Sequence, residues 1–242
     1  MQFTCETIRE NARRSLKGKW TLIALCTLLY SNLRDVMDLM PSKLHLGRVS
    51  LTLTLVSTAL FIFGYNDIIL QMTRGNNVEF LKFFSGCKRA LRGFRMYISV
   101  GVITLLYSIL LVIPGVIAMI KYSMTFFIWV DNPNISVSEA IDKSVDMTSG
   151  HKLEIFKLIL SFIGWFLLIF ALFLGVEYMS RNYITNSIWL AQNCGKIILS
   201  IGFIYLETYI NVSMGVLYNK LMEVNASEEN KLVLDEQTRQ LN

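Results

Sequence analysis

The sequence contains little charge for its size. Only 17% of its 242 residues are charged, 53% are hydrophobic, and the mean hydropathy is +0.47. Soluble globular chains carry about a quarter charged residues. A helix that crosses a bilayer needs about 20 mostly apolar residues, and stretches of that length recur along nearly the whole chain. This recurrence argues against a soluble protein with one large core and predicts an integral membrane protein.

Patterns typical of metal sites, disulfides and enzymes are absent from the sequence. Its two histidines, His45 and His151, belong to no ligand cluster, and its four cysteines show no CxxC spacing. HExxH, GxSxG, a P-loop and a dinucleotide-binding GxGxxG are missing as well. We therefore expect no enzyme activity, no metal site, no cofactor and no ATP-driven pump within this chain. The net charge of +5 is distributed as at a membrane surface, so we expect no nucleic-acid partner.

The apolar stretches predict an all-α integral membrane protein with about six transmembrane helices. These helices form a single membrane domain, 1–221, followed by a polar cytoplasmic tail, 222–242. No small-residue cleavage site follows the first apolar run, so we expect that run to be a retained span rather than a signal peptide. The predicted spans are about 20–40, 49–72, 96–113, 115–130, 155–176 and 196–219.

The distribution of lysine and arginine predicts the orientation of these spans. With the N-terminus inside, 17 of the 23 lysine and arginine residues fall in inner segments and four fall in outer ones. Cytoplasmic segments of membrane proteins carry such an excess of positive charge. The sequence therefore predicts that both termini are cytoplasmic.

An amphipathic stretch precedes each pair of spans, which predicts three hairpins with a cytoplasmic helix before each. The stretches are 4–20, 78–94 and 136–152. Apolar residues of the second stretch fall on one stripe of an α-helix, namely Phe80, Phe83, Phe84, Cys87 and Leu91. Such helices either pack to orient the hairpins or bind anionic headgroups of the lipid bilayer. In the third stretch, Ser136 and Glu139 have capping-box spacing, and Asn132-Pro133 predicts the end of the fourth span.

Pro114 and Gly115 stand between the third and fourth spans with almost no polar loop around them. Pro-Gly is a strong turn signal. One continuous helix over 96–130 would measure about 52 Å, which is too long for one crossing. We therefore expect these two residues to form a tight outer turn.

Lys121 falls in the middle of the predicted fourth span. A charge at the bilayer centre costs about 2.5–3.5 kcal/mol on insertion scales, so it should face the bundle interior and find a partner. Asp67 in the second span and Glu207 in the sixth are the two acids in reach, with Glu207 closer in depth. These three residues form a candidate intramembrane charged site for an ion, a proton or a polar headgroup. The alternative is a buried pair that fixes the register of the helices.

Several strings resemble one family of bacterial integral membrane proteins. They are "IRENARRSLKGKW" at 8–20, "VIPGVIAMIKYSMTFFIWVDNPNIS" at 112–136, "SEAIDKSVDMTSGHK" at 138–152, "LSFIGW" at 160–165 and, more loosely, "YINVSMGVLYNKL" at 209–221. The sequence is similar in this order to the domain of unknown function 975. The resemblance implies a multi-span protein of the bacterial cytoplasmic membrane and brings no established activity. Segments 34–48 and 177–195 depart from the family pattern.

Two functions are compatible with these features. The first is a non-enzymatic scaffold, regulator or accessory subunit that works with a membrane protein partner. The second is a small transporter, permease subunit or lipid-handling protein that uses the candidate charged site.

Overall fold

The computed structural model describes residues 4–30, 47–110, 112–183 and 188–240. Within these ranges every regular element is a helix, which confirms the predicted all-α class. The elements are α1 (Cys5–Leu16), α2 (Trp20–Tyr30), α4 (Gly47–Thr73), the 3-10 helix η2 (Phe80–Arg89), α5 (Ala90–Leu110), α6 (Val112–Tyr122), α7 (Thr125–Asp131), α8 (Val137–Thr148), α9 (Lys152–Tyr183) and α10 (Ile188–Gln240).

Three of the described helical segments are long and apolar enough to cross a membrane. They are Ile113–Asp131, Lys152–Met179 and Ile198–Ser227. Trp20–Tyr30 is a shorter apolar helix, and the remainder of the first predicted span lies outside the described residues. The second predicted span coincides with α4, whose 27 residues form one helix. The total of six spans remains a prediction.

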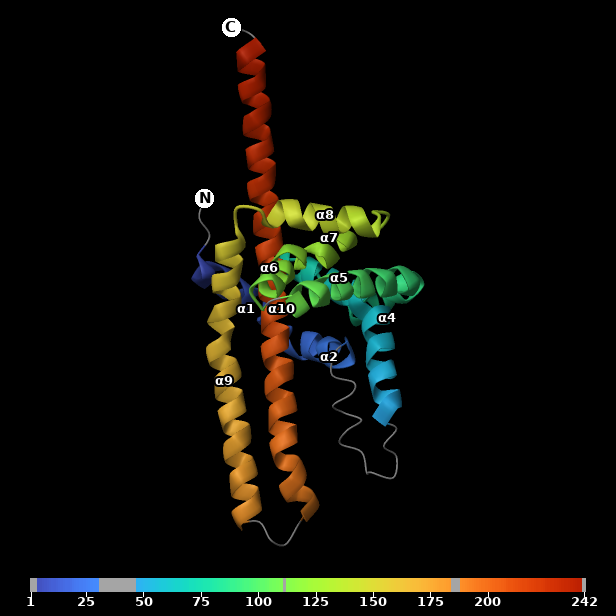
Figure 1. The fold of residues 1–242 in the computed structure, drawn as a ribbon, viewed down its shortest axis with the longest axis vertical. Coiled ribbons are helices and arrows are strands. Elements are labelled where there is room, and N and C mark those ends of the chain that lie inside the picture. The colour runs from blue at the N-terminus through green and yellow to red at the C-terminus, as the bar shows by residue number, and fades with distance from the viewer. Residues whose placement is uncertain (1–3, 31–46, 111, 184–187, 241–242) are drawn as a thin grey trace.

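The long helices α9 and α10 lie side by side and define the long axis of the molecule (Figure 1). Helix α8 lies across this axis at the end where α9 begins, and the last part of α10 projects beyond it. Helices α5 and α6 pack against each other and against α8. The transverse helices therefore lie around the middle of the long axis, with the end of α10 projecting on one side and the far ends of the α9–α10 pair on the other (Figure 1).

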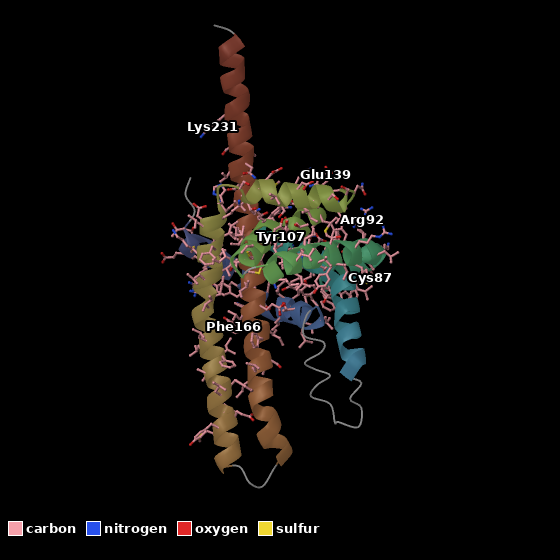
Figure 2. The ribbon with its side chains drawn as sticks, viewed as in Figure 1. Cys87, Arg92, Tyr107, Glu139, Phe166 and Lys231 are labelled. Atoms are coloured by element: carbon pink, nitrogen blue, oxygen red, sulfur yellow. The ribbon has the colours of Figure 1, made fainter. Side chains whose placement is uncertain are left out.

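The surface of α9 is apolar along most of its length. Its exposed side chains include Trp165, Phe166 and Leu167, which are 45%, 47% and 61% exposed. Figure 2 shows the side chains along this helix, with Phe166 labelled on the side of α10, where its ring centre lies 5.1 Å from that of Phe203. A continuous apolar surface of this kind suits lipid tails rather than water, so α9 is suited to a membrane.

The core lies where α4 packs against η2, α7 and α10. Its largest fully buried side chains include Trp129, Tyr65, Tyr218 and Phe83. Gly215 of α10 allows the closest approach of this helix to α4, because a Cβ there would lie 2.4 Å from a methyl carbon of Ile69. The four elements are thus fixed against one another near α8.

The second amphipathic stretch does not form the predicted α-helical stripe. Residues Phe80–Arg89 form a 3-10 helix, in which every third residue shares a face. Phe83 and Gly86 are buried on this face, and the Arg89 guanidinium lies 4.7 Å from the ring centre of Phe63. Phe84, Cys87 and Leu91, predicted to share the apolar stripe, are exposed instead.

Two glycines explain why η2 packs so closely on α4. A Cβ at Gly64 would lie 1.9 Å from the carbonyl oxygen of Phe83, and a Cβ at Gly86 would lie 2.7 Å from the carbonyl oxygen of Leu60. The two backbones therefore touch directly. Packing, rather than the intrinsic preference for an α-helix, determines the period of this segment.

The predicted fourth span consists of two helices. Helix α6 ends at Tyr122 and α7 begins at Thr125. Pro114 and Gly115 lie within the first turn and a half of α6, not in the connection to α5. Proline is tolerated there because the first N–H groups of a helix have no intrahelical partner. A Cβ at Gly115 would lie 2.4 Å from Ser108 Oγ, so this glycine permits α5 and α6 to touch.

The boundaries near the C-terminus also differ from the predicted ones. The segment 177–195, expected to be a polar linker, is helical as far as Tyr183 and again from Ile188. Helix α10 continues without a break through the predicted tail and ends at Gln240. No proline occurs between 177 and 240, and polar residues alone do not prevent a helix from continuing.

The start of α8 follows the sequence prediction. Ser136 is the N-cap, and its hydroxyl oxygen accepts a 3.2 Å hydrogen bond from the Glu139 N–H. Helix α7 ends at Asp131, directly before Asn132-Pro133, as predicted. These local signals place α8 across the ends of the longer helices.

Candidate functional site

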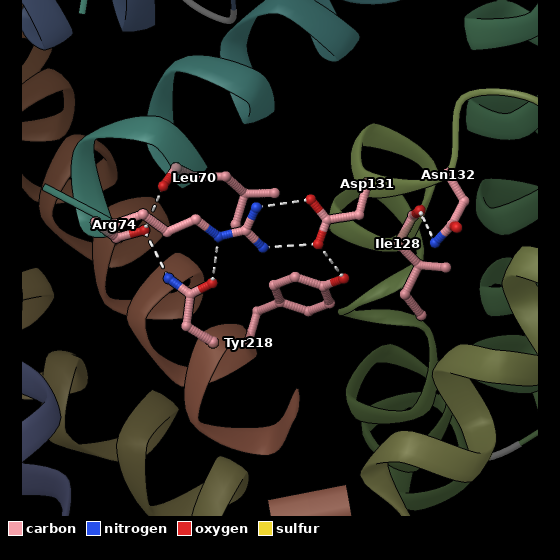
Figure 3. A network of polar contacts seen from close by, with 8 residues as sticks. Leu70, Arg74, Ile128, Asp131, Asn132 and Tyr218 are labelled. Carbon is pink, nitrogen blue, oxygen red and sulfur yellow. Dashed lines mark hydrogen bonds and ion pairs between the residues drawn. The ribbon is translucent and has the colours of Figure 1, made fainter. Parts of the chain in front are cut away.

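A cluster of polar side chains joins α4, α7 and α10 (Figure 3). Arg74 follows α4 and donates from both terminal nitrogens to Asp131, over 2.8 Å to Oδ1 and 2.7 Å to Oδ2. The hydroxyl of Tyr218 donates to the same Oδ2 over 2.8 Å. Arg74 Nε donates to Asn219 Oδ1 over 3.0 Å, and Asn219 Nδ2 donates to Thr73 Oγ1 over 2.9 Å. We call these five residues the Arg74 cluster.

The electrostatics of the Arg74 cluster favour a permanently charged pair. The hydrogen bonds from Arg74 to Asp131 raise the pKa of the guanidinium, although partial burial acts in the opposite direction. The side chain of Asp131 is only 18% exposed and that of Arg74 is 40% exposed. A bidentate arginine–carboxylate pair combines charge with a fixed geometry. The cluster therefore holds three helices in one arrangement.

A polar hollow of about 360 Å³ lies beside the Arg74 cluster, at the loop between α7 and α8. Asp131 contributes to its wall together with Glu139 and Lys143 of α8. The loop is also held from α5, because Arg92 donates to the carbonyl oxygen of Pro133. No group of histidine, cysteine, aspartate and glutamate suited to a metal ion occurs among the described residues. The hollow is an open surface feature, and the Asp131 carboxylate at its edge is already bonded to Arg74 and Tyr218.

A second polar cluster lies deeper, between α2, α4 and α10. The Thr27 hydroxyl lies 2.9 Å from both the Tyr65 hydroxyl and the Thr208 hydroxyl. Asn211 donates to the Tyr65 hydroxyl over 3.2 Å, and the rings of Tyr30 and Tyr65 stack with centres 4.6 Å apart. Hydroxyl and amide groups of this kind join helices inside membranes.

Glu207 lies next to this interior cluster. Its carboxylate is close enough to interact electrostatically with the phenols of Tyr30 and Tyr65. Asp67 lies one turn further along α4 than Phe63 and accepts a 2.7 Å hydrogen bond from Gln71. The two acids of the candidate charged site therefore have neighbours other than Lys121.

Lys121 lies at the end of α6, against α8, rather than in the middle of a continuous helix. Its carbonyl oxygen accepts a 2.7 Å hydrogen bond from Ser144 Oγ, which also accepts from the Met124 N–H. None of the ion pairs between described residues joins Lys121 to Asp67 or Glu207. The break after Tyr122 places Lys121 in the last turn of α6, although it still falls in the middle of the apolar segment Ile113–Asp131.

Sequence reasoning did not identify the members of the Arg74 cluster. The sequence places Arg74 among the inner positive charges and Asp131 directly before Asn132-Pro133, and neither position predicts a partner. Tyr218 and Asn219 lie in "YINVSMGVLYNKL" and Asp131 lies in "DNPNIS", both strings used for the family resemblance. Their place in these two strings is the only sequence signal for the cluster, and it does not indicate that the residues are in contact.

The fold and these clusters define an all-helical protein with helices suited to a membrane. The comparisons with known proteins give its family: residues 91–225 match the model of the family described as "Protein of unknown function (DUF975)", and the chain belongs to that family. The matched region includes Asp131, Tyr218 and Asn219 but not Arg74. Neither a curated protein nor a solved structure matches the chain.

Proposed function

We propose that this protein is a non-enzymatic scaffold, regulator or accessory subunit of a bacterial cytoplasmic membrane. The observation that carries the proposal is that its clustered polar side chains form hydrogen bonds with one another. Arg74 and Asp131 are bonded to each other, Arg74 also donates to Asn219 of α10, and Asp131 also accepts from Tyr218 of α10. An active site or a transport site needs polar groups that can bind a ligand. The polar groups of the Arg74 cluster are instead hydrogen-bonded to one another.

The interior polar cluster supports the same proposal. Thr27, Tyr65 and Thr208 come from three different helices, and the Thr27 hydroxyl forms a hydrogen bond with each of the other two hydroxyls. Each such bond contributes only about 1 kcal/mol in a membrane protein, but together they fix the register of helices that have no hydrophobic force between them. Their arrangement therefore fits a structural role.

The proposed orientation places α1, η2 and α8 at the cytoplasmic surface, with both termini inside. The excess of lysine and arginine in the predicted inner segments supports it. In this orientation the projecting end of α10 extends into the cytoplasm, where a partner protein can reach it. The loop between α9 and α10 faces the exterior.

Replacement of Lys121 tests a scaffold against a small transporter or lipid-handling protein. Cells that carry only the Lys121→Met variant are compared with cells that carry Lys143→Met, which removes an exposed cation from α8. For each variant we would measure growth, the size of the native membrane complex and the thermal stability of the purified protein. A scaffold predicts normal growth and complex size in both.

A transport site predicts a different result. Loss of growth or of solute uptake in Lys121→Met alone, with complex size and thermal stability unchanged, contradicts the scaffold proposal. The native complex itself is a further check. A chain that migrates only as the 27.7 kDa protein, with no partner after mild cross-linking, also contradicts it.

A further inference from the structure

A cavity of about 140 Å³ lies between α1, α2, α9 and α10. Its lining is mostly apolar and aromatic, with a single cation, and consists of Arg13, Trp20, Trp165, Ile169, Tyr205, Leu206 and Tyr209. This volume is close to that of a cavity that binds one benzene molecule, so it holds a short segment of hydrocarbon. The cavity belongs to neither polar cluster described above.

The cation in this cavity is held in place but not neutralised. Arg13 Nε donates to the Tyr209 hydroxyl over 3.1 Å, and that hydroxyl donates to the carbonyl oxygen of Arg9 over 3.1 Å. The two terminal nitrogens of Arg13 form no hydrogen bond or ion pair within the described part of the chain. A guanidinium with two parallel N–H groups available is suited to bind a phosphate.

A neighbouring arginine adds to the positive charge. The guanidinium of Arg9 lies 5.8 Å from the ring centre of Phe162, and its Nε is buried with no hydrogen-bond partner. On α1 the buried residues Ile8, Ala12 and Leu16 face the bundle, which leaves Arg13 at the edge of the packed face. The cation therefore lies where the transverse helix meets the long helices.

The positions of the aromatic side chains distinguish the two ends of the cavity. Trp20 and Tyr205 stack with ring centres 4.4 Å apart. Because α9 and α10 run in opposite directions along the same axis (Figure 1), Tyr205 lies one turn deeper than Tyr209, and Ile169 one turn deeper than Trp165. The cavity thus has Arg13 and Tyr209 at one end and Tyr205 and Ile169 about 6 Å further from α8.

We propose that this cavity binds one anionic glycerophospholipid, with the phosphate on Arg13 and the upper part of an acyl chain against Trp165 and Ile169. Beyond the cavity the chain continues along the exposed apolar side chains of α9, which include Leu168 and Leu172. Tryptophan and tyrosine favour the boundary between headgroups and tails, where one end of the ring is apolar and the other wet. The proposal rests on the membrane placement of α9 and not on the scaffold role.

The charge of the surroundings selects an anionic lipid over a zwitterionic one. Arg13, which lines the cavity, and Lys17, four residues later, are both exposed, whereas Arg14 is already paired with Glu10 over 2.6 Å. A lipid with a choline headgroup would bring the positive charge of choline close to Arg13 and Lys17. Free phosphate would leave the apolar lining uncovered, so the lipid is favoured over a soluble ion.

Quenching of tryptophan fluorescence tests the proposal, because Trp20 and Trp165 line the cavity. The full-length protein in detergent micelles is titrated with phosphatidylglycerol brominated on its acyl chains, and separately with brominated phosphatidylcholine. The variants are Arg13→Gln and its matched control Arg14→Gln, which removes the same charge from the neighbouring position outside the cavity. A second pair is Ile169→Phe, which fills the cavity, and Ile163→Phe, an exposed residue of α9 outside it.

We expect saturable quenching with phosphatidylglycerol at a concentration at least about tenfold lower than with phosphatidylcholine. Arg13→Gln should raise the phosphatidylglycerol midpoint about tenfold or more, and Ile169→Phe should abolish saturation. The midpoints of Arg14→Gln and Ile163→Phe should stay within about twofold of that of the unsubstituted protein. Equal midpoints for the two lipids, or equal effects of Arg13→Gln and Arg14→Gln, overturn the proposal. So does competition by inorganic phosphate at millimolar concentration. If Arg13→Gln does not fold, the comparison of Ile169→Phe with Ile163→Phe tests the proposal.

Discussion

Arg74 and Asp131 lie 57 residues apart in the sequence and are joined by two parallel hydrogen bonds of 2.8 and 2.7 Å. Tyr218 donates to the same carboxylate from a third helix. The pair links the end of α4 to the end of α7, where the chain turns toward α8. It is a bidentate ion pair between distant elements, and it connects α4 to the loop that leads into α8.

Asp131→Asn should lower the free energy of unfolding by about 1–2 kcal/mol. The amide keeps the shape of the carboxylate but leaves the Arg74 guanidinium without its counter-charge, and hydrogen bonds to charged groups contribute about 1.5–3 kcal/mol. Water at the 40% exposed Arg74 side chain recovers part of that loss. Thermal unfolding of the purified protein in detergent measures the effect.

Glu223→Gln is the matched control for this variant. Glu223 forms an ion pair with Lys220 on α10, but its side chain is 66% exposed, so its loss should change stability by less than about 0.5 kcal/mol. The double variant Arg74→Gln/Asp131→Asn should cost less than the sum of the single variants, because the two residues share one interaction. If the loss of stability in the double variant equals the sum of the losses in the two single variants, Arg74 and Asp131 do not stabilise the protein through their contact.

Gly64→Ala should destabilise the contact between α4 and η2 by about 1–3 kcal/mol. The new methyl group would lie 1.9 Å from the Phe83 carbonyl oxygen, so the two backbones must separate. Gly101→Ala is the control, since no atom lies within 4 Å of a Cβ at that position of α5. Alanine there should be neutral or slightly stabilising in thermal unfolding. Equal stabilities of the two variants would contradict the close packing of η2.

Ser136→Ala should destabilise α8 by about 1 kcal/mol, because the N–H of Glu139 loses its only side-chain acceptor at the helix start. Ser138→Ala, two residues later and exposed, should have little effect. Hydrogen exchange of the amides in the first turn of α8 measures the difference. Faster exchange is expected in Ser136→Ala alone, and unchanged exchange there would show that the cap does not hold the helix.

The sequence predicted those features that depend on neighbouring residues. The apolar runs predicted helices at α4, α5, α9 and α10, and the Ser136–Glu139 spacing predicted the start of α8. Asn132-Pro133 predicted the end of α7. In each case the physical cause acts within a few residues: a backbone N–H and a nearby hydroxyl, a proline that cannot continue a helix, or a span of suitable length.

Features that depend on distant residues were not predictable in the same way. The 3-10 geometry of η2 depends on Gly64 in another helix, and the position of Lys121 depends on the break between α6 and α7 and on Ser144 of α8. The Arg74 cluster unites residues up to 146 positions apart. Reading one segment at a time could identify each of these residues as charged or polar but could not assign its partner.

The location of the two ends of α10 tests the account most directly, because the scaffold and the lipid site both place α1, α8 and the end of α10 in or beside the cytoplasm. A reporter that is active only outside the cell is fused after Asn242 in one strain and inserted between Tyr183 and Ile188 in another. We predict silence after Asn242 and activity at the insertion, with the reverse for a reporter active only in the cytoplasm. Exterior activity after Asn242, or silence at both positions with intact expression, would contradict the account.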